Sequence, residues 1–345
     1  MAHTLPSETT VSPQELEKIL SLFPDLTEED LKAASPEESA AVVQERPPVS
    51  YWSDAWRRLK KNKIAIAAFI TILILILLAV FGPMLSPYTY DQQIRGEESQ
   101  APSWAHPFGT DNLGRDLLVR TMIGARISLF IGIVSSLIVL VIGSIYGAVS
   151  GLAGGAVDNF MMRIVDILNS IPTILMVIAI KMVIDRPLED MVNRGVHWIQ
   201  AIGSGMIAIF IVYGLLYWVG MARIVRGQVL MLKEMEYIHA AEALGASRSL
   251  LIRKHLLPNC IGQLIVTTML QIPSAIFTEA FLSFLGIGVS VPMASLGSLC
   301  SSALNGISSY PYRLLFPALT ISLIILAFNL FGDGLRDALD PRLKT

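Results

Sequence analysis

Long apolar runs separated by polar segments dominate the chain. Six runs reach the length of about 20 residues that a helix needs to cross the roughly 30 Å hydrocarbon core of a bilayer. They cover 64–85, 127–152, 159–184, 200–222, 261–287 and 312–333. Because lipid offers no hydrogen-bond partner to backbone groups, each run must be helical. The pattern predicts an all-α, polytopic membrane protein with six transmembrane helices.

Composition supports a membrane location. Hydrophobic residues make up 53 % of the chain and charged residues only 16 %, whereas soluble proteins carry about 25 % charged residues. The first apolar run follows a basic flank, as a secretory signal does, but it is longer than about 20 residues and starts late in the chain. We therefore interpret it as a retained transmembrane helix and not as a cleaved signal peptide.

Positive charges gather on one side of the predicted topology. With six spans, the flank of the first span, the polar segment after the fourth and the carboxyl-terminal tail share a side. Their basic residues are Arg57, Arg58, Lys60, Lys61, Lys63, Lys233, Arg248, Arg253, Lys254, Arg336, Arg342 and Lys344. The positive-inside rule makes this side cytoplasmic, so both termini are expected inside. Cys260 and Cys300 then fall on opposite sides, which predicts no disulfide between them.

Four regions are expected along the chain. They are an acidic cytoplasmic extension at 1–47, a first helix with an extracytoplasmic segment at 48–126, a core at 127–334 and a cytoplasmic tail at 335–345. The extension contains ten acidic residues and two lysines, and its cap-like residues predict short helices. It is either a mostly disordered tail or a segment that docks on protein, because an anionic lipid leaflet repels it.

Glycines recur every four residues in the second apolar run, at Gly143, Gly147, Gly151 and Gly155. This spacing puts them on one face of a helix, where small residues let another helix approach closely. The alternative for the last of them is that it opens the short loop at 154–158. We expect tight helix packing along the stripe, with Gly154 and Gly155 counted as part of the turn.

Three of the charged residues inside the apolar runs are candidates for a specific role. Arg163 and Asp166 share a helix face in the third run and form a structural ion pair, a contact to a neighbouring subunit or, as the less favoured alternative, a proton relay. Pro172 is expected to kink the same helix, because it lacks a backbone donor. Glu279, in the fifth run, makes either a buried hydrogen bond to a neighbouring helix, which we favour, or a contact to substrate.

Signatures of enzymes and of nucleotide binding are absent from the sequence. It contains no G-x-x-x-x-G-K-[ST] phosphate loop, no H-E-x-x-H pair and no Cys or His set at metal spacing. The five histidines are scattered, and at loop positions we expect them to be solvated. We therefore expect no catalytic residue, no cofactor or metal, and no nucleic-acid partner. Any energy for uphill transport must come from another polypeptide.

The polar segment 234–258, between the fourth and fifth runs, is the strongest functional candidate. Gly245 permits the positive φ of a turn, and Pro258 is expected to end the helix that follows this turn. The pattern predicts a water-exposed helix-turn-helix that another protein grips. Its candidate contact residues are His239, Ala240, Ala241, Glu242, Gly245, Ala246 and Pro258.

This segment resembles the E-A-A-x-x-x-G-x(9)-I-x-L-P loop of ABC-importer permeases. The matching positions are Ala240, Ala241, Gly245, Leu257 and Pro258. His239 stands in place of the Glu, and His255 in place of the Ile. The resemblance implies a type I ABC importer permease fold over 127–334. It also implies that the loop forms a coupling helix, which inserts into a groove on an ATP-binding subunit.

Further segments are similar to the peptide- and nickel-importing branch of these permeases. They are 106–116, 124–129, 279–288 and 332–342. Leu296 stands where that branch usually has a Trp. The resemblance covers residues 50–345 and implies a multi-pass protein of the bacterial cell membrane, similar to the second permease of oligopeptide importers.

The resemblance also implies partners. They are a homologous second permease, two ATP-binding subunits that hydrolyse the ATP, an extracytoplasmic substrate-binding protein, a peptide substrate and membrane lipid. Dipeptides or nickel chelates are alternative cargoes of the same architecture. An ion-driven secondary transporter is the rival class, but that class typically has two similar halves with helices broken at matched positions, which this sequence lacks.

Overall fold

The computed structural model describes residues 51–289 and 294–339. The chain divides into two units, Met1–Asp54 and Ala55–Thr345, and the second unit contains the long apolar helices. The predicted acidic extension at 1–47 and the end of the predicted tail, from residue 340, lie outside the described residues.

The described residues contain helices, one isolated β-bridge between Thr110 and Asp116, and no strand, which confirms the all-α prediction. The helices in chain order are α3 (Tyr51–Lys61), α4 (Lys63–Leu85), α5 (Leu117–Ala153), α6 (Gly155–Ser170), α7 (Thr173–Asn193), α8 (His197–Ile202), α9 (Ser204–Leu216), α10 (Trp218–Leu232), α11 (Glu236–Ala243), α12 (Arg248–Leu250), the π-helix η1 (Leu251–Leu256), α13 (Leu257–Asn259), α14 (Ile261–Phe284), α15 (Leu296–Ala303), the 3-10 helix η2 (Leu304–Gly306) and α16 (Tyr312–Leu339).

Five segments of the described chain are long and apolar enough to cross a membrane, and they confirm five of the six predicted runs. They are α4, α5, α9 together with α10, α14 and α16. α5 begins before the predicted start at 127, because the Asp116 side chain caps it by accepting a hydrogen bond from the Val119 N–H at 2.8 Å. At the other end of the chain, α16 continues beyond 333 to Leu339.

The third predicted run, 159–184, is wrong as one continuous helix. It is divided between α6 and α7, which meet at an angle of 90°. Ile171 takes an extended conformation with ψ 137°, and Pro172 precedes the first residue of α7. A residue before proline is disfavoured in the helical region, and proline has no N–H to continue the ladder. The predicted kink at Pro172 is therefore in the right place, but the chain turns there more sharply than a kinked helix does.

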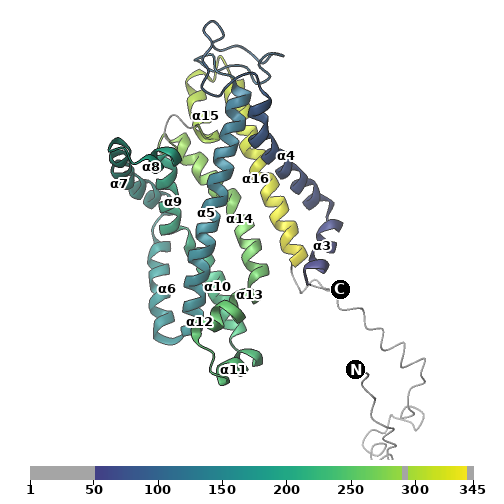
Figure 1. Ribbon diagram of the computed structural model, residues 1–345, viewed down its shortest axis with the longest axis vertical. Helices are drawn as coiled ribbons and strands as arrows, with labels where there is room; N and C mark the ends of the chain where they lie inside the picture. Colours follow the sequence, from purple (N-terminus) through teal and green to yellow (C-terminus); the bar gives the residue numbers. More distant parts are fainter. Residues whose placement is uncertain (1–50, 290–293, 340–345) are drawn as a thin grey trace, which may run out of the picture. The chain divides into compact units, whose positions relative to one another are not determined.

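α5 is the helix around which the second unit is packed. It contacts α4, α9, α10 and α14, and Figure 1 shows α10 and α14 running beside it. Side chains from α5, α9 and α10 share a buried cluster with Ile238, Leu251 and Leu256, which belong to the polar segment. The core of the spans therefore extends into the loop that the sequence singled out.

The glycine stripe of α5 faces α10. A Cβ on Gly147 would lie 2.4 Å from the Ala222 carbonyl oxygen, and one on Gly151 would lie 3.0 Å from Val229. Gly155 has nothing within 4 Å and a φ of +55°, so it packs against no helix and begins α6 at the bend after α5. The prediction of tight packing is confirmed for the first three glycines of the stripe.

The segment between α4 and α5 is held by a buried histidine. His106 is 1 % exposed; its Nδ1 lies 2.8 Å from Asp116, and its Nε2 lies 3.1 Å from Glu97. The expectation that histidines at loop positions are solvated is wrong here. Since Asp116 also caps α5, this histidine ties the segment to the start of the central helix.

Gly147→Ala is expected to destabilise the protein by about 1–3 kcal/mol, because overpacking forces backbone shifts where α5 and α10 touch. The measurement is the free energy of unfolding in detergent, or the shift of Tm.

Gly227→Ala is the matched control. Gly227 lies in α10 with nothing within 4 Å of its Cβ position, so alanine should be neutral or stabilising by up to about 1 kcal/mol. Equal effects of the two substitutions would contradict the close approach at Gly147.

Candidate functional site

α11 is a short helix that ends in a glycine turn. The Gly245 N–H donates to the Glu242 carbonyl at 2.9 Å, and the Ala246 N–H donates to the Ala241 carbonyl at 3.0 Å. These two bonds form a Schellman motif, which needs a left-handed residue after the helix end. Gly245 supplies it with a φ of +84°, as the turn predicted from the sequence requires.

One side chain anchors α11 to the transmembrane core. Ile238 is fully buried and belongs to the cluster that α5 and α10 form. Ala241 and Ala246 pack against the same cluster. Their small size lets α11 and the turn lie close to the helices beneath. Sequence reasoning missed Ile238, because a single apolar residue in an eight-residue helix gives no periodic signal.

The rest of α11 and its flanks is exposed. His239, Ala240 and Glu242 face solvent, with His239 Nδ1 and Glu242 Oε2 separated by 3.8 Å. Large apolar side chains accompany them, since Tyr237 is 43 % exposed and Leu244 is 90 % exposed. Figure 1 places α11 at the opposite end of the α5 axis from α15. An anchored helix with exposed apolar side chains is typical of a protein-docking surface.

A second helical stretch follows the turn. Ser247 caps it by accepting a hydrogen bond from the Leu250 N–H at 3.3 Å, and it continues through η1, where the Leu257 N–H donates to the Ile252 carbonyl. Pro258 does not end this stretch. It lies inside α13, and the stretch stops at Asn259. The predicted role of Pro258 as the helix end is therefore wrong by one residue.

Two ion pairs join α6 to α10, and neither is the predicted pair of Arg163 with Asp166. Asp166 pairs with Arg223 at 2.8 Å, with both side chains partly exposed. The Arg163 side chain is exposed and makes no hydrogen bond or ion pair within the described residues. The stronger pair is Asp158 with Arg226, whose Nε donates at 2.6 Å.

Asp158 is the centre of this second pair. It is 6 % exposed and accepts hydrogen bonds from two nitrogens of the Arg226 guanidinium, Nε and Nη2, and from the Ser150 hydroxyl. It therefore links α5, α6 and α10 at one point. The bidentate geometry makes this a strong, directional contact.

Glu279 is a structural carboxyl in the described fold. It is fully buried and accepts hydrogen bonds from Ser128 at 2.9 Å and from Ser283 at 2.7 Å. The Ser128 hydroxyl also lies 3.4 Å from the Leu296 N–H at the start of α15. Of the two interpretations of Glu279, the geometry supports the buried hydrogen bond to a neighbouring helix.

A further charged pair was missed in the sequence. Lys181, in α7, is 1 % exposed, and its Nζ lies 2.6 Å and 2.8 Å from the two carboxylate oxygens of Asp185. The spacing of four residues on one helix face is a sequence signal that could have identified the pair. No group of His, Cys, Asp and Glu within the described ranges is arranged to hold a metal ion.

Comparison with protein families gives two matches. Residues 140–345 match the model of the binding-protein-dependent transport system inner membrane component. Residues 50–102 match the N-terminal TM domain of oligopeptide transport permease C.

Individual relatives align over most of the chain. The chain is 46 % identical over 296 residues to the oligopeptide transport system permease protein OppC of Bacillus subtilis (strain 168), covering 86 % of the chain and 91 % of the relative. It is 47 % identical over 300 residues to the dipeptide transport system permease protein DppC of the same organism, covering 87 % and 88 %. It is 44 % identical over 295 residues to OppC of Escherichia coli (strain K12), covering 85 % and 92 %.

Asp158→Ala is expected to cost about 3 kcal/mol or more of unfolding free energy, because it leaves the Arg226 charge partly buried without its partner. Thermal unfolding in detergent measures the loss.

Asp166→Ala is the control on the same helix. Its pair with Arg223 is solvent-exposed, so the loss should stay below about 1 kcal/mol. An equal or larger loss for Asp166→Ala would show that the buried pair is not the stronger link.

Proposed function

Because the chain belongs to the family of binding-protein-dependent transport system inner membrane components, we propose that it is one of two membrane subunits of an ATP-driven peptide importer. The second membrane subunit is a homologous permease, and the two together enclose the path. An extracytoplasmic binding protein delivers the substrate. The chain itself hydrolyses nothing, and two ATP-binding subunits supply the energy.

The single observation that carries this proposal is the construction of α11. Ile238 fixes the helix to the core of the spans, while Tyr237 and Leu244 remain exposed. A helix built only to close a loop has no need of a leucine that is 90 % exposed at its tip. A groove on an ATP-binding subunit would cover these side chains, as the resemblance to coupling helices implies.

The contacts of α11 suggest how force is transmitted. When two ATP-binding subunits close on ATP, the two coupling helices docked on them move together, which is a rigid-body displacement. In this chain the movement passes from α11 through Ile238 to α5 and α10. The Asp158–Arg226 pair carries it on to α6. The cavity between the two permeases then changes from inward-facing to outward-facing.

The membrane orientation follows from the basic residues. The flank of α4 and the loop from Lys233 to Lys254 lie on the cytoplasmic side, together with both termini. The segment between α4 and α5, with His106, and the turn around Gly195 lie outside. This orientation presents α11 to soluble ATP-binding subunits.

Peptides are the proposed cargo. The aligned relatives are an oligopeptide permease at 46 % identity and a dipeptide permease at 47 %, so the two cargo classes are equally close in sequence. Oligopeptides are the first choice because the match at 50–102 is to the N-terminal TM domain of oligopeptide transport permease C. The same architecture would also serve dipeptides or nickel chelates. The path would be lined by the third to fifth predicted runs, which correspond to α6, α7, α9, α10 and α14.

Gly245→Pro is expected to abolish substrate-stimulated ATP hydrolysis and transport in the reconstituted complex, while the protein stays inserted. Proline fixes φ near −65° and has no N–H, so it removes both the +84° backbone and the bond to Glu242. The measurements are ATP hydrolysis and peptide uptake in proteoliposomes.

Gly195→Pro is the matched control. Gly195 has a φ of +82° and donates to the Val192 carbonyl at 2.9 Å, so the same local damage falls on the turn after α7. Stimulated hydrolysis should be retained there. Normal coupled turnover in Gly245→Pro, or equal loss in both variants, would contradict the docking role of α11.

Cysteine labelling tests the orientation. A membrane-impermeant maleimide should label Trp104→Cys in intact cells and label Glu234→Cys only after the membrane is opened, because both side chains are exposed. The native cysteines give little background, since burial raises the pKa of the Cys260 and Cys300 thiols to about 11. Labelling of Glu234→Cys from outside would overturn the proposed topology.

A further inference from the structure

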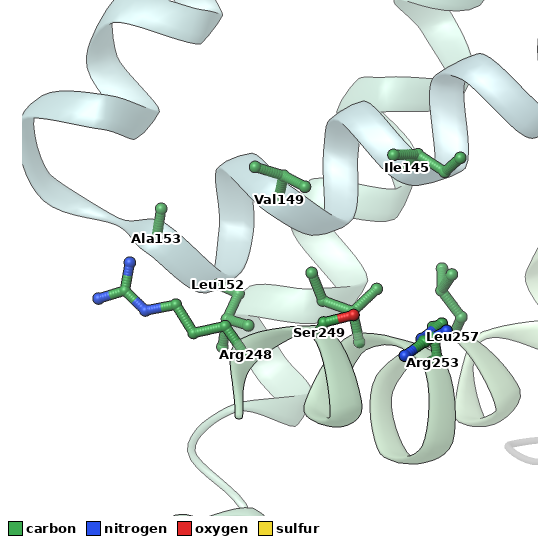
Figure 2. Close-up of a pocket in the computed structure, with 9 residues that line it drawn as sticks. Ile145, Val149, Leu152, Ala153, Arg248, Ser249, Arg253 and Leu257 are labelled. Atoms are coloured by element: carbon green, nitrogen blue, oxygen red, sulfur yellow. The ribbon is translucent and has the colours of Figure 1, made fainter. Parts of the chain in front are cut away.

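A groove lies beside the second half of the polar loop. Its volume is about 440 Å³, within the range of about 300–1,000 Å³ that is common for ligand sites. One wall is the end of α5 and the other is the stretch from α12 to α13, as Figure 2 shows. The lining residues are Ile145, Val149, Leu152, Ala153, Arg248, Ser249, Ile252, Arg253 and Leu257.

The two walls differ in chemistry. The α5 wall is aliphatic, and its side chains lack cover: Ile145 is 53 % exposed and Val149 is 39 % exposed. Arg248 and Arg253 lie on the other wall, and both are exposed. Figure 2 shows the Arg248 side chain extending toward Ala153 at the end of α5. The groove therefore joins an apolar surface of a membrane span to a pair of guanidinium groups.

No acidic side chain in the described part of the chain lies within ion-pairing distance of the two arginines. Neither Arg248 nor Arg253 makes a side-chain hydrogen bond or an ion pair there, although other arginines and lysines of the same unit form such contacts. Ser249 adds a hydroxyl donor between them. Guanidinium groups suit phosphate because they present several N–H donors in a planar fork.

We propose that this groove binds an anionic phospholipid of the cytoplasmic leaflet, with the phosphate at Arg248 and Arg253 and an acyl chain along Ile145 and Val149. The choice of leaflet rests on the proposed orientation of the loop. Basic pockets on the cytoplasmic side of membrane proteins attract acidic headgroups. An acidic peptide would match the arginines but not the aliphatic wall, whereas an amphiphile matches both.

A lipid in this groove would support the docking loop, because of where the groove lies. Leu257 and Ile252 also pack against the buried cluster that holds Ile238, so the groove adjoins the anchor of α11. A lipid that bridges α5 and the stretch after Gly245 would brace the docking loop against the membrane.

The test measures how much lipid the purified full-length protein and its variants retain. Any subunits that copurify are kept in the sample. The protein is equilibrated in mixed micelles of phosphatidylglycerol and phosphatidylcholine, and bound lipid is counted by native mass spectrometry. The double variant Arg248→Gln/Arg253→Gln should retain at least about tenfold less phosphatidylglycerol, since each basic residue near an anionic surface contributes about 1 kcal/mol.

Two further variants make the test specific. Lys254→Gln removes an exposed charge from the same stretch but not from the groove lining, and it should retain phosphatidylglycerol as the parent does. Val149→Trp fills the apolar wall without changing charge and should lower retention of phosphatidylglycerol. All variants are compared as monodisperse protein of unchanged helical content.

Several results would overturn the proposal. They are equal retention of the two lipids by the parent, an equal loss in Lys254→Gln, or a photocrosslink from Ser249 that reaches a protein partner in membranes. The assay needs neither ATP nor substrate. A failure of the proposed transport function would therefore leave lipid retention unchanged, and a failure of lipid retention would leave the Gly245 test unaffected.

Discussion

The backbone contact between α5 and α10 is the constraint on which the rest of the arrangement depends. At Gly147 no side chain separates the helix from the Ala222 carbonyl, so α10 lies at a fixed depth and rotation. α10 then passes through the short link 233–235 into α11, and Ile238 returns α11 to the core that α10 helps to form. Such cores are close-packed and resist compression. α11 is therefore packed as part of the transmembrane helices and not as a separate loop.

Polar contacts fix further helices to α5 and α10. Asp158, in the first turn of α6, binds Arg226 in α10 and Ser150 in α5. α6 is therefore fixed near its first turn, while the break at Pro172 lets α7 turn through 90° and pack against α9. Nearer the other end of α5, Glu279 in α14 accepts a hydrogen bond from Ser128 and so joins α5 to α14. The central helix is thus tied to its neighbours by polar contacts at both ends and by glycines between them.

Hydropathy located the spans well because lipid imposes length and helicity on any apolar run. It could not reveal the angle between α6 and α7, since an average over a window carries no direction, although Pro172 marks the break. Helix spacing paired Arg163 with Asp166, but packing between helices decides such pairs. Asp166 meets a partner 57 residues away, and Glu279 meets one 151 residues away. The glycine turn was predictable because Gly245 acts through its own backbone.

The tip of α11 has a consequence for the life of the unassembled chain. Leu244 stands almost wholly in water beside a turn, and a protruding leucine on an accessible loop is a feature that chaperones and proteases recognise in immature proteins. In the importer proposed above, an ATP-binding subunit covers this leucine, so a copy made in excess of such subunits would display it. In the proposed complex, Leu244 would therefore be exposed only in copies that lack a partner.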